Sequence, residues 1–198
     1  MKIGFAFLLS LGVLTLCTFS SSAGAEEAGQ SLVVQGKPPK GAYSEQQPDY
    51  LHFKEVKITR EGKQRLSFDI TLQGELPKNP KESVSFYFGF DIDQDASTGS
   101  VAAHAPGFGQ DVGFFIYQNQ GDSKFIVYSN AVDYKGRMRS IDVSGLKVRD
   151  NKIEVKVRSD LFSLFDSFKF FLSASQTIYS NGKKVSETQV NTTPITKF

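Results

Sequence analysis

Three aspartates stand at alternate positions in one short stretch of this chain, Asp91, Asp93 and Asp95, and Thr98-Gly99 follows them. A fourth carboxylate, Asp111, begins the next apolar segment, to which the loop must return. In a tight loop, alternate side chains can turn toward one centre. Hard oxygen donors at this density suit Ca²⁺, which takes roughly six to eight oxygen ligands. The spacing therefore predicts a calcium site with Asp91, Asp93, Asp95 and Asp111 as ligands.

Two interpretations of this acidic loop stay open. The spacing is not that of an EF-hand, because Ala96 stands where that motif has Gly and Ala102 stands where it has Glu. Unpaired carboxylates this close would repel one another, which gives a bound cation a physical reason. Alternatively, the aspartates cap backbone N–H groups in Asx-turns of a solvated loop.

The loop is flanked by two segments with the patterns of β-strands. Before it, every second residue from Val84 to Phe90 is apolar, and after it the segment Val112–Tyr117 is apolar on both faces. Alternation is typical of a half-buried strand, whereas an apolar run of this length is typical of a central one. The acidic loop therefore connects two strands.

The rest of the chain repeats these patterns. Alternation is clearest in Leu66–Leu72, whereas Leu51–Ile58 contains a phase slip that predicts a β-bulge. Asp150-Asn151 predicts a hairpin turn, and Ser159 is a candidate N-cap for a single helical turn. About eight or nine short strands with at most one helical turn predict an all-β fold. We expect an antiparallel β-sandwich, jelly-roll or immunoglobulin-like, over residues 50–180.

The N-terminus predicts export. Lys2, the apolar run Ile3–Phe19 and the small residues Ala23–Ala25 together have the form of a secretory signal peptide over residues 1–25. The run is shorter than the ~20 residues of a membrane-spanning helix. The single cysteine, Cys17, would be removed with it, so no disulfide is expected. We expect a periplasmic or extracellular protein without a transmembrane segment after cleavage.

Composition sets the remaining boundaries. Residues 26–49 are rich in Gly, Pro, Gln and Ser and predict a flexible leader, in which Val33-Val34 could add a short edge strand. The polar residues 181–198 predict a loosely held tail. Lys and Arg number 23 against 21 Asp and Glu, so the nearly neutral chain gives no footprint for nucleic acid.

Catalytic motifs are missing from the sequence. It contains no Gly-x-Ser-x-Gly, no His-Glu-x-x-His and no phosphate-binding loop, and signal cleavage would leave no cysteine nucleophile. A carboxylate pair such as Asp91 and Asp111 could serve a glycosidase. Acidic loops of small secreted sandwiches more often bind cations or turn the chain, so we expect a protein that is not an enzyme.

The acidic loop also carries a resemblance. A strand, D-x-D-x-D-x-x-T-G, a glycine-rich stretch, G-x-D and a second strand follow one another around Asp91–Asp111. This order resembles bacterial exported β-sandwich domains of the CBM9-like and DOMON-like group. Pro48–Leu51 and Gly74–Pro77 extend the resemblance, which covers Asp49–Ser175. It implies that the four aspartates bind a cation or organise the loop, with Thr98-Gly99 fixing the turn.

The resemblance further implies two classes of ligand. Haem-binding members use a Met and a His as axial ligands, for which this chain offers Met138 with His52 or His104. Carbohydrate-binding members stack sugars on exposed Trp, which this chain lacks. Its aromatic candidates for stacking are Tyr43, Tyr50, Tyr87, Tyr117, Tyr128, Tyr134 and Tyr179.

Together these observations predict a secreted or envelope-associated, non-enzymatic binding or interaction module with a calcium-stabilised acidic loop. Its partner would be a glycan or another envelope protein. A CBM9-like carbohydrate-binding domain is the main alternative, and a DOMON-like haem-binding electron-transfer domain is a further one.

Overall fold

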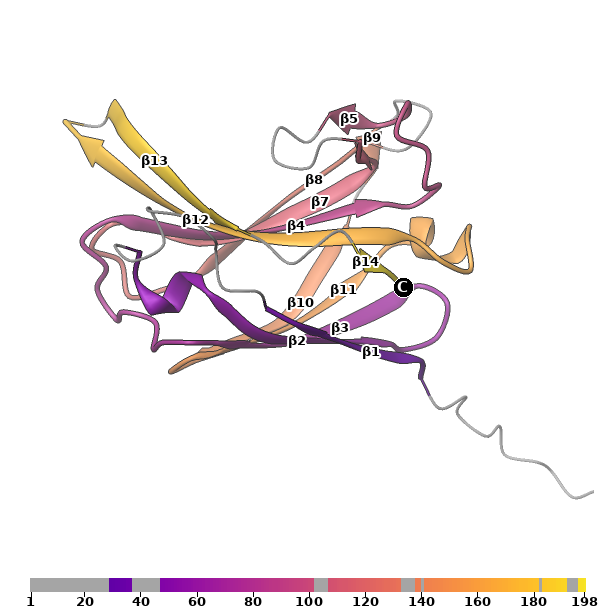
Figure 1. Cartoon of the computed structure of the whole chain (residues 1–198), viewed down its shortest axis with the longest axis horizontal. Helices are drawn as coiled ribbons and strands as arrows, with labels where there is room; N and C mark the ends of the chain where they lie inside the picture. Colours follow the sequence, from indigo (N-terminus) through magenta and orange to yellow (C-terminus); the bar gives the residue numbers. More distant parts are fainter. Residues whose placement is uncertain are drawn as a thin grey trace, which may run out of the picture.

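Two antiparallel β-sheets stacked face to face form the body of the molecule (Figure 1). The computed structural model describes residues 29–36, 47–101, 107–132, 138–139, 141–181, 183–191 and 196–198. The architecture confirms the predicted all-β, antiparallel sandwich. The expected signal peptide and most of the expected leader lie outside the described residues.

The described strands form a smaller sheet, a large sheet and a short ribbon. The smaller sheet has the order β1 (Ser31–Gln35), β2 (Phe53–Arg60), β3 (Arg65–Leu72), β11 (Lys152–Arg158), β10 (Asp142–Arg149). The large sheet has the order β13 (Lys183–Asn191), β12 (Lys169–Ser180), β4 (Ser83–Asp91), β7 (Val112–Gln118), β8 (Ile126–Val132), β9 (Met138–Arg139), with β14 (Thr196–Lys197) also paired to β12. The ribbon pairs β5 (Ser100–Val101) with β6 (Gly109–Gln110).

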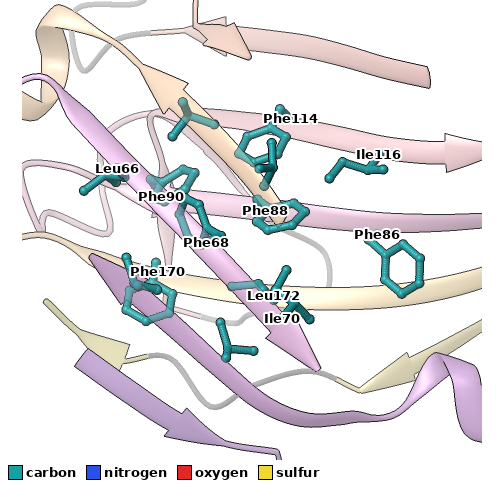
Figure 2. Close-up of a cluster of buried hydrophobic side chains, with 14 of the residues drawn as sticks. Leu66, Phe68, Ile70, Phe86, Phe88, Phe90, Phe114, Ile116, Phe170 and Leu172 are labelled. Carbon is teal, nitrogen blue, oxygen red and sulfur yellow. The ribbon is translucent and has the colours of Figure 1, made fainter. Parts of the chain in front are cut away.

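A phenylalanine-rich core fills the space between the two sheets (Figure 2). The alternating residues of β3 and β4 supply it from opposite sides, because every second side chain of a strand points to the same face. Phe88 stacks on Phe114 of β7 at a centroid distance of 4.2 Å, and Phe68 of β3 packs edge-on against Phe88 at 5.4 Å. Such pairs add to the stabilisation that area burial gives. The core fixes the strands that carry the acidic loop.

Several local predictions are confirmed. The phase slip in β2 is a register shift between Phe53 and Glu55, and Val33-Val34 lies in the edge strand β1. Asp150 has a φ of 50° in the turn between β10 and β11. The Ser159 side chain accepts a hydrogen bond from the Leu161 N–H at the start of the 3₁₀ helix η3 (Asp160–Ser163). These features follow from the residue types at each position and could therefore be predicted from the local sequence.

The structure has more elements than the sequence predicts. The described residues contain a second 3₁₀ helix, η2 (Asp49–Leu51), and short strands such as β9 and β14, which raise the strand count above nine. The polar segment expected to be a loose tail forms β13 along its length up to Asn191. Backbone pairing with the long strand β12 holds β13 in place. The described side chains of β13, at positions 183–186, are exposed, and Val185 is 62% exposed.

Candidate metal centre

Strand pairing brings the two ends of the acidic loop together. β4 ends at Asp91 and β7 begins at Val112, and Phe90 is the register partner of Val112. The Asp111 N–H donates to the Phe90 carbonyl at 2.9 Å, so Asp111 lies beside the end of β4. In Figure 1 the loop and its β5 strand lie over the end of β4 and β7, on the side of the large sheet away from the smaller one.

The turn of the loop depends on Thr98 and Gly99. Thr98 Oγ1 donates to the Asp93 carboxylate at 2.9 Å from Oδ2, and the Thr98 N–H donates to the Asp95 carbonyl. Gly99 has a φ of 70°, and a Cβ there would collide with the Gln110 carbonyl. Only glycine, which has no side chain, suits both the positive φ and the close approach of the Gln110 carbonyl. The Thr98-Gly99 pair therefore closes the loop, with the Ser100–Gln110 pairing of β5 and β6 after it.

Three of the four predicted aspartates converge. Asp91, Asp93 and Asp111 each offer a carboxylate oxygen within 4.8 Å of the others. Asp91 is fully buried and Asp111 is 1% exposed. Both oxygens of Asp91 and Oδ1 of Asp111 have no hydrogen-bond partner among the described residues. Buried carboxylate oxygens are normally satisfied, so this centre has acceptor capacity that a cation would use.

Burial and mutual repulsion both oppose ionisation of the centre. Burial raises the pKa of Asp111 to about 6, although the Ile92 N–H, which donates to Oδ2 at 2.7 Å, works against the rise. Burial also raises the pKa of Asp91; the charge of Lys169 lowers it and that of Asp93 raises it. A divalent cation would reverse this balance by favouring the ionised carboxylates.

Asp95 does not join the centre. Its exposed carboxylate accepts hydrogen bonds from the Ser97 N–H at 2.9 Å and from Ser97 Oγ at 2.6 Å. These bonds lower the pKa of Asp95. It therefore forms the Asx-turn that the alternative interpretation assigned to the whole loop. Asp93 belongs to the converging carboxylates and also forms an Asx-turn, because its Oδ1 accepts a hydrogen bond from the Asp95 N–H at 2.9 Å.

A lysine at the centre was missed by the sequence reasoning. Lys169 of β12 is the register partner of Asp91, and its Nζ lies 3.6 Å from Asp91 Oδ2. Nζ also donates to the Gln94 carbonyl at 3.2 Å. No local sequence signal joins positions 91 and 169, since the contact depends on which strands are neighbours.

The structure describes only some of the candidates for other ligands. His52 is 5% exposed, in the chain just before β2. His104 and the side chain of Met138 lie outside the described residues, as do Tyr43 and Tyr134. Tyr50 is partly buried and accepts a hydrogen bond from Gln176 Nε2 at 3.2 Å.

Three tyrosines gather on the outer face of the large sheet. Tyr117, Tyr128 and Tyr179 line a groove of about 380 Å³, together with Phe115. Phe115 and Tyr128 are register partners on neighbouring strands, so their rings project from the same face. Tyr87 packs beside this groove, with its ring 4.4 Å from that of Phe115. The sequence did not identify Phe115 as a surface residue, because β7 is apolar on both faces and so shows no alternation that would separate its outer face from its inner one.

A scan of protein-family models and searches of curated proteins and of solved structures gave no match to this chain. Within the part of the chain that the structure describes, no helix has the length and apolar character needed to cross a membrane.

Proposed function

We propose that this protein is an exported, non-enzymatic binding module whose acidic loop is held in place by Ca²⁺ at Asp91, Asp93 and Asp111. The observation that carries the proposal is the fully buried Asp91 carboxylate, which faces two further carboxylates while both of its oxygens lack a hydrogen-bond partner among the described residues. The Lys169 ammonium, 3.6 Å from Asp91 Oδ2, offsets only one of the three carboxylate charges. The charge that remains is costly to bury, and a cation offsets that cost.

The donor set favours calcium over other divalent ions. The converging side chains are all carboxylates, and the described groups contain no His or Cys that would favour zinc. The loop also has backbone carbonyls, which calcium takes as ligands in variable number; that of Gln94 accepts a hydrogen bond from Lys169 Nζ at 3.2 Å. Magnesium needs a stricter octahedral arrangement and binds through fewer protein groups. Calcium therefore suits an irregular loop best.

Calcium would act here by keeping the acidic loop in one conformation on the large sheet. The loop carries Phe108, which packs edge-on against Phe171 of β12 at a centroid distance of 4.9 Å. Phe171 contacts Tyr87, and Tyr87 contacts Phe115 at the groove. A fixed loop thus supports the exposed aromatic face. Sites of extracellular modules bind calcium with dissociation constants of about 10⁻⁴–10⁻³ M, which suits a chain expected to be exported.

Thermal unfolding of the purified protein in EDTA, in millimolar CaCl₂ and in millimolar MgCl₂ tests the proposal. We expect a rise in Tm with CaCl₂ that exceeds the rise with MgCl₂ at the same concentration, because a ligand that binds the folded state stabilises it by mass action. Equal melting temperatures in EDTA and in CaCl₂ would contradict the calcium function.

A second candidate function is carbohydrate binding, and the aromatic groove favours it. Phe115, Tyr128 and Tyr179 are 37%, 58% and 44% exposed, which is high for large aromatic side chains. The same groove is lined by Lys184 and by neutral polar groups that could hydrogen-bond a sugar: Ser83, Ser85, Asn119 and Thr177. The combination of apolar rings and neutral polar groups suits a glycan, and so does the resemblance to the CBM9-like group.

A glycan array read with the purified protein tests this candidate. We expect Tyr128→Ala to lose the glycan signals that the natural protein gives. Val33→Ala is the matched control, because Val33 is 50% exposed on the edge strand of the other sheet. An array without signal, or signals equal in both variants, would exclude glycan binding in this groove.

A further inference from the structure

A lysine already supplies positive charge at the carboxylate centre. Lys169 Nζ lies 3.6 Å from Asp91 Oδ2, which is an ion-pair distance beyond the range of a direct hydrogen bond. We propose that Lys169 is a built-in competitor of Ca²⁺: its ammonium neutralises part of the centre when the metal is absent, and the metal displaces it. The inference rests on the calcium function proposed above and assigns the residue that sets the affinity.

The position of Lys169 is fixed by the sheet. Asp91 and Lys169 are register partners in β4 and β12, so their side chains project from the same face of the large sheet. The Lys169 ammonium also donates to the Gln94 carbonyl at 3.2 Å. Gln94 is itself attached to the segment just before β12, since its Nε2 donates to Ser167 Oγ at 2.9 Å. The lysine therefore closes the acidic loop onto β12.

Repulsion between the two cations opposes their binding side by side at the centre. The lysine offsets one charge of the three carboxylates, and the two Asp91 oxygens lack a partner at hydrogen-bond distance among the described residues. A divalent ion among the same carboxylates would lie close to the ammonium, and like charges at such distances repel strongly in a partly buried site. In the proposed exchange the ammonium moves away from the carboxylates when the metal binds.

The lysine has a path by which it can leave. Its side chain is 32% exposed, whereas Asp91 is fully buried, so the flexible stem can carry the ammonium into water while the carboxylate stays in place. Departure would also free the Gln94 carbonyl, an oxygen of the kind that calcium binds. The centre would therefore be closed by lysine at low calcium and filled by metal at high calcium.

Isothermal titration of the purified protein with CaCl₂ tests this inference through two variants. Lys169→Met removes the charge and keeps the length of the stem, and Lys169→Arg is the control that keeps the charge. We expect Lys169→Met to bind Ca²⁺ about tenfold more tightly than the natural protein, because the competing charge is gone. Lys169→Arg should bind with an affinity within a few-fold of the natural one. In EDTA, Lys169→Met should melt at a lower temperature than the natural protein.

The outcomes separate this inference from the proposed function. If the natural protein and Lys169→Met bind Ca²⁺ equally well, or the variant binds more weakly, competition by Lys169 is overturned and the calcium function stands. If Lys169→Met binds and the natural protein does not, the lysine blocks the site and the calcium function fails. If neither binds, both are overturned.

A second measurement covers the case in which Lys169→Met does not fold. Reductive ¹³C-methylation keeps the charge of lysines, and the NMR signal of Lys169 is identified by its loss in Lys169→Arg. We expect CaCl₂ to move this signal toward the position of solvent-exposed lysines. A signal that stays unchanged while calcium binds would overturn the displacement.

Discussion

The ring of Phe171 occupies the space above Gly89, its register partner in the pairing of β12 with β4. A Cβ at Gly89 would lie 2.5 Å from Phe171 Cε1, closer than atoms can approach. Phe171 in turn receives the edge of Phe108 from the acidic loop. The missing side chain at Gly89 therefore makes room for the aromatic contact that attaches the loop to the sheet, beside the carboxylate centre.

Gly89→Ala should lower the free energy of unfolding by about 1–3 kcal/mol, the usual cost of overpacking a filled site. Urea unfolding at fixed calcium measures it. Phe171→Leu and the double variant complete a cycle, in which we expect the alanine to cost less once the ring is gone. An equal cost in both backgrounds would show that the collision with Phe171 is not the cause.

Asp93→Asn should abolish the rise in Tm with CaCl₂, whereas Asp95→Asn, the matched control from the same loop, should keep it. Asp93 belongs to the converging carboxylates and Asp95 caps Ser97. Both substitutions keep an oxygen that can accept the existing hydrogen bonds. At calcium about 100-fold above the dissociation constant, the stabilisation at stake is about 2.7 kcal/mol. Equal behaviour of the two variants in thermal melts would contradict the three-carboxylate centre.

The sequence predicts the sandwich because its strands bury one face. Residues such as Phe68 and Phe88 alternate with polar neighbours, and this pattern alone decides which side enters the core. The strand β13 could not be predicted in this way, since its described side chains are exposed and its order comes from backbone pairing with β12. Backbone hydrogen bonds between strands do not require apolar side chains, so a hydrophobicity pattern cannot predict this pairing.

The candidate site was predictable only in part. Asp91 ends β4 and Asp111 directly precedes the neighbouring strand β7, so local order places them together. Whether Asp93 or Asp95 turns inward depends on the backbone of the loop, where Gln94 has a φ of 60°. Lys169 enters from a strand that is distant in sequence, which no spacing rule within the loop can reveal.

Arg60→Met should lower the free energy of unfolding by about 1–3 kcal/mol, because it would leave carbonyls without donors. The Arg60 guanidinium donates to the carbonyls of Phe162, Phe165 and Asp166, at 3.1 Å for Phe165 and 2.7 Å for Asp166. It thereby joins β2 to η3 and to the segment that follows it. Arg60→Lys keeps the charge without the planar fork and should recover only part of the loss in urea unfolding. Full recovery would mean that charge alone matters there.

The buried Asp111 should make the metal-free protein less stable as the pH rises. Its pKa is raised to about 6 in the folded protein, above the usual 3.8 expected of the unfolded chain, so the folded state holds the proton more tightly between these values. Stability in EDTA therefore falls as the pH rises through this window and stays low above it. The raised pKa of Asp91 acts in the same direction.

Asp111→Asn isolates this contribution, because the amide stays neutral at every pH. In EDTA near neutral pH we expect the variant to be more stable than the natural protein, by on the order of 2 kcal/mol. The difference should shrink toward about pH 4, where the natural carboxyl is protonated as well. In CaCl₂ the order should reverse, since the metal needs the carboxylate. Urea unfolding of both proteins across this range decides the matter: a difference that does not change with pH would mean that Asp111 titrates alike in both states.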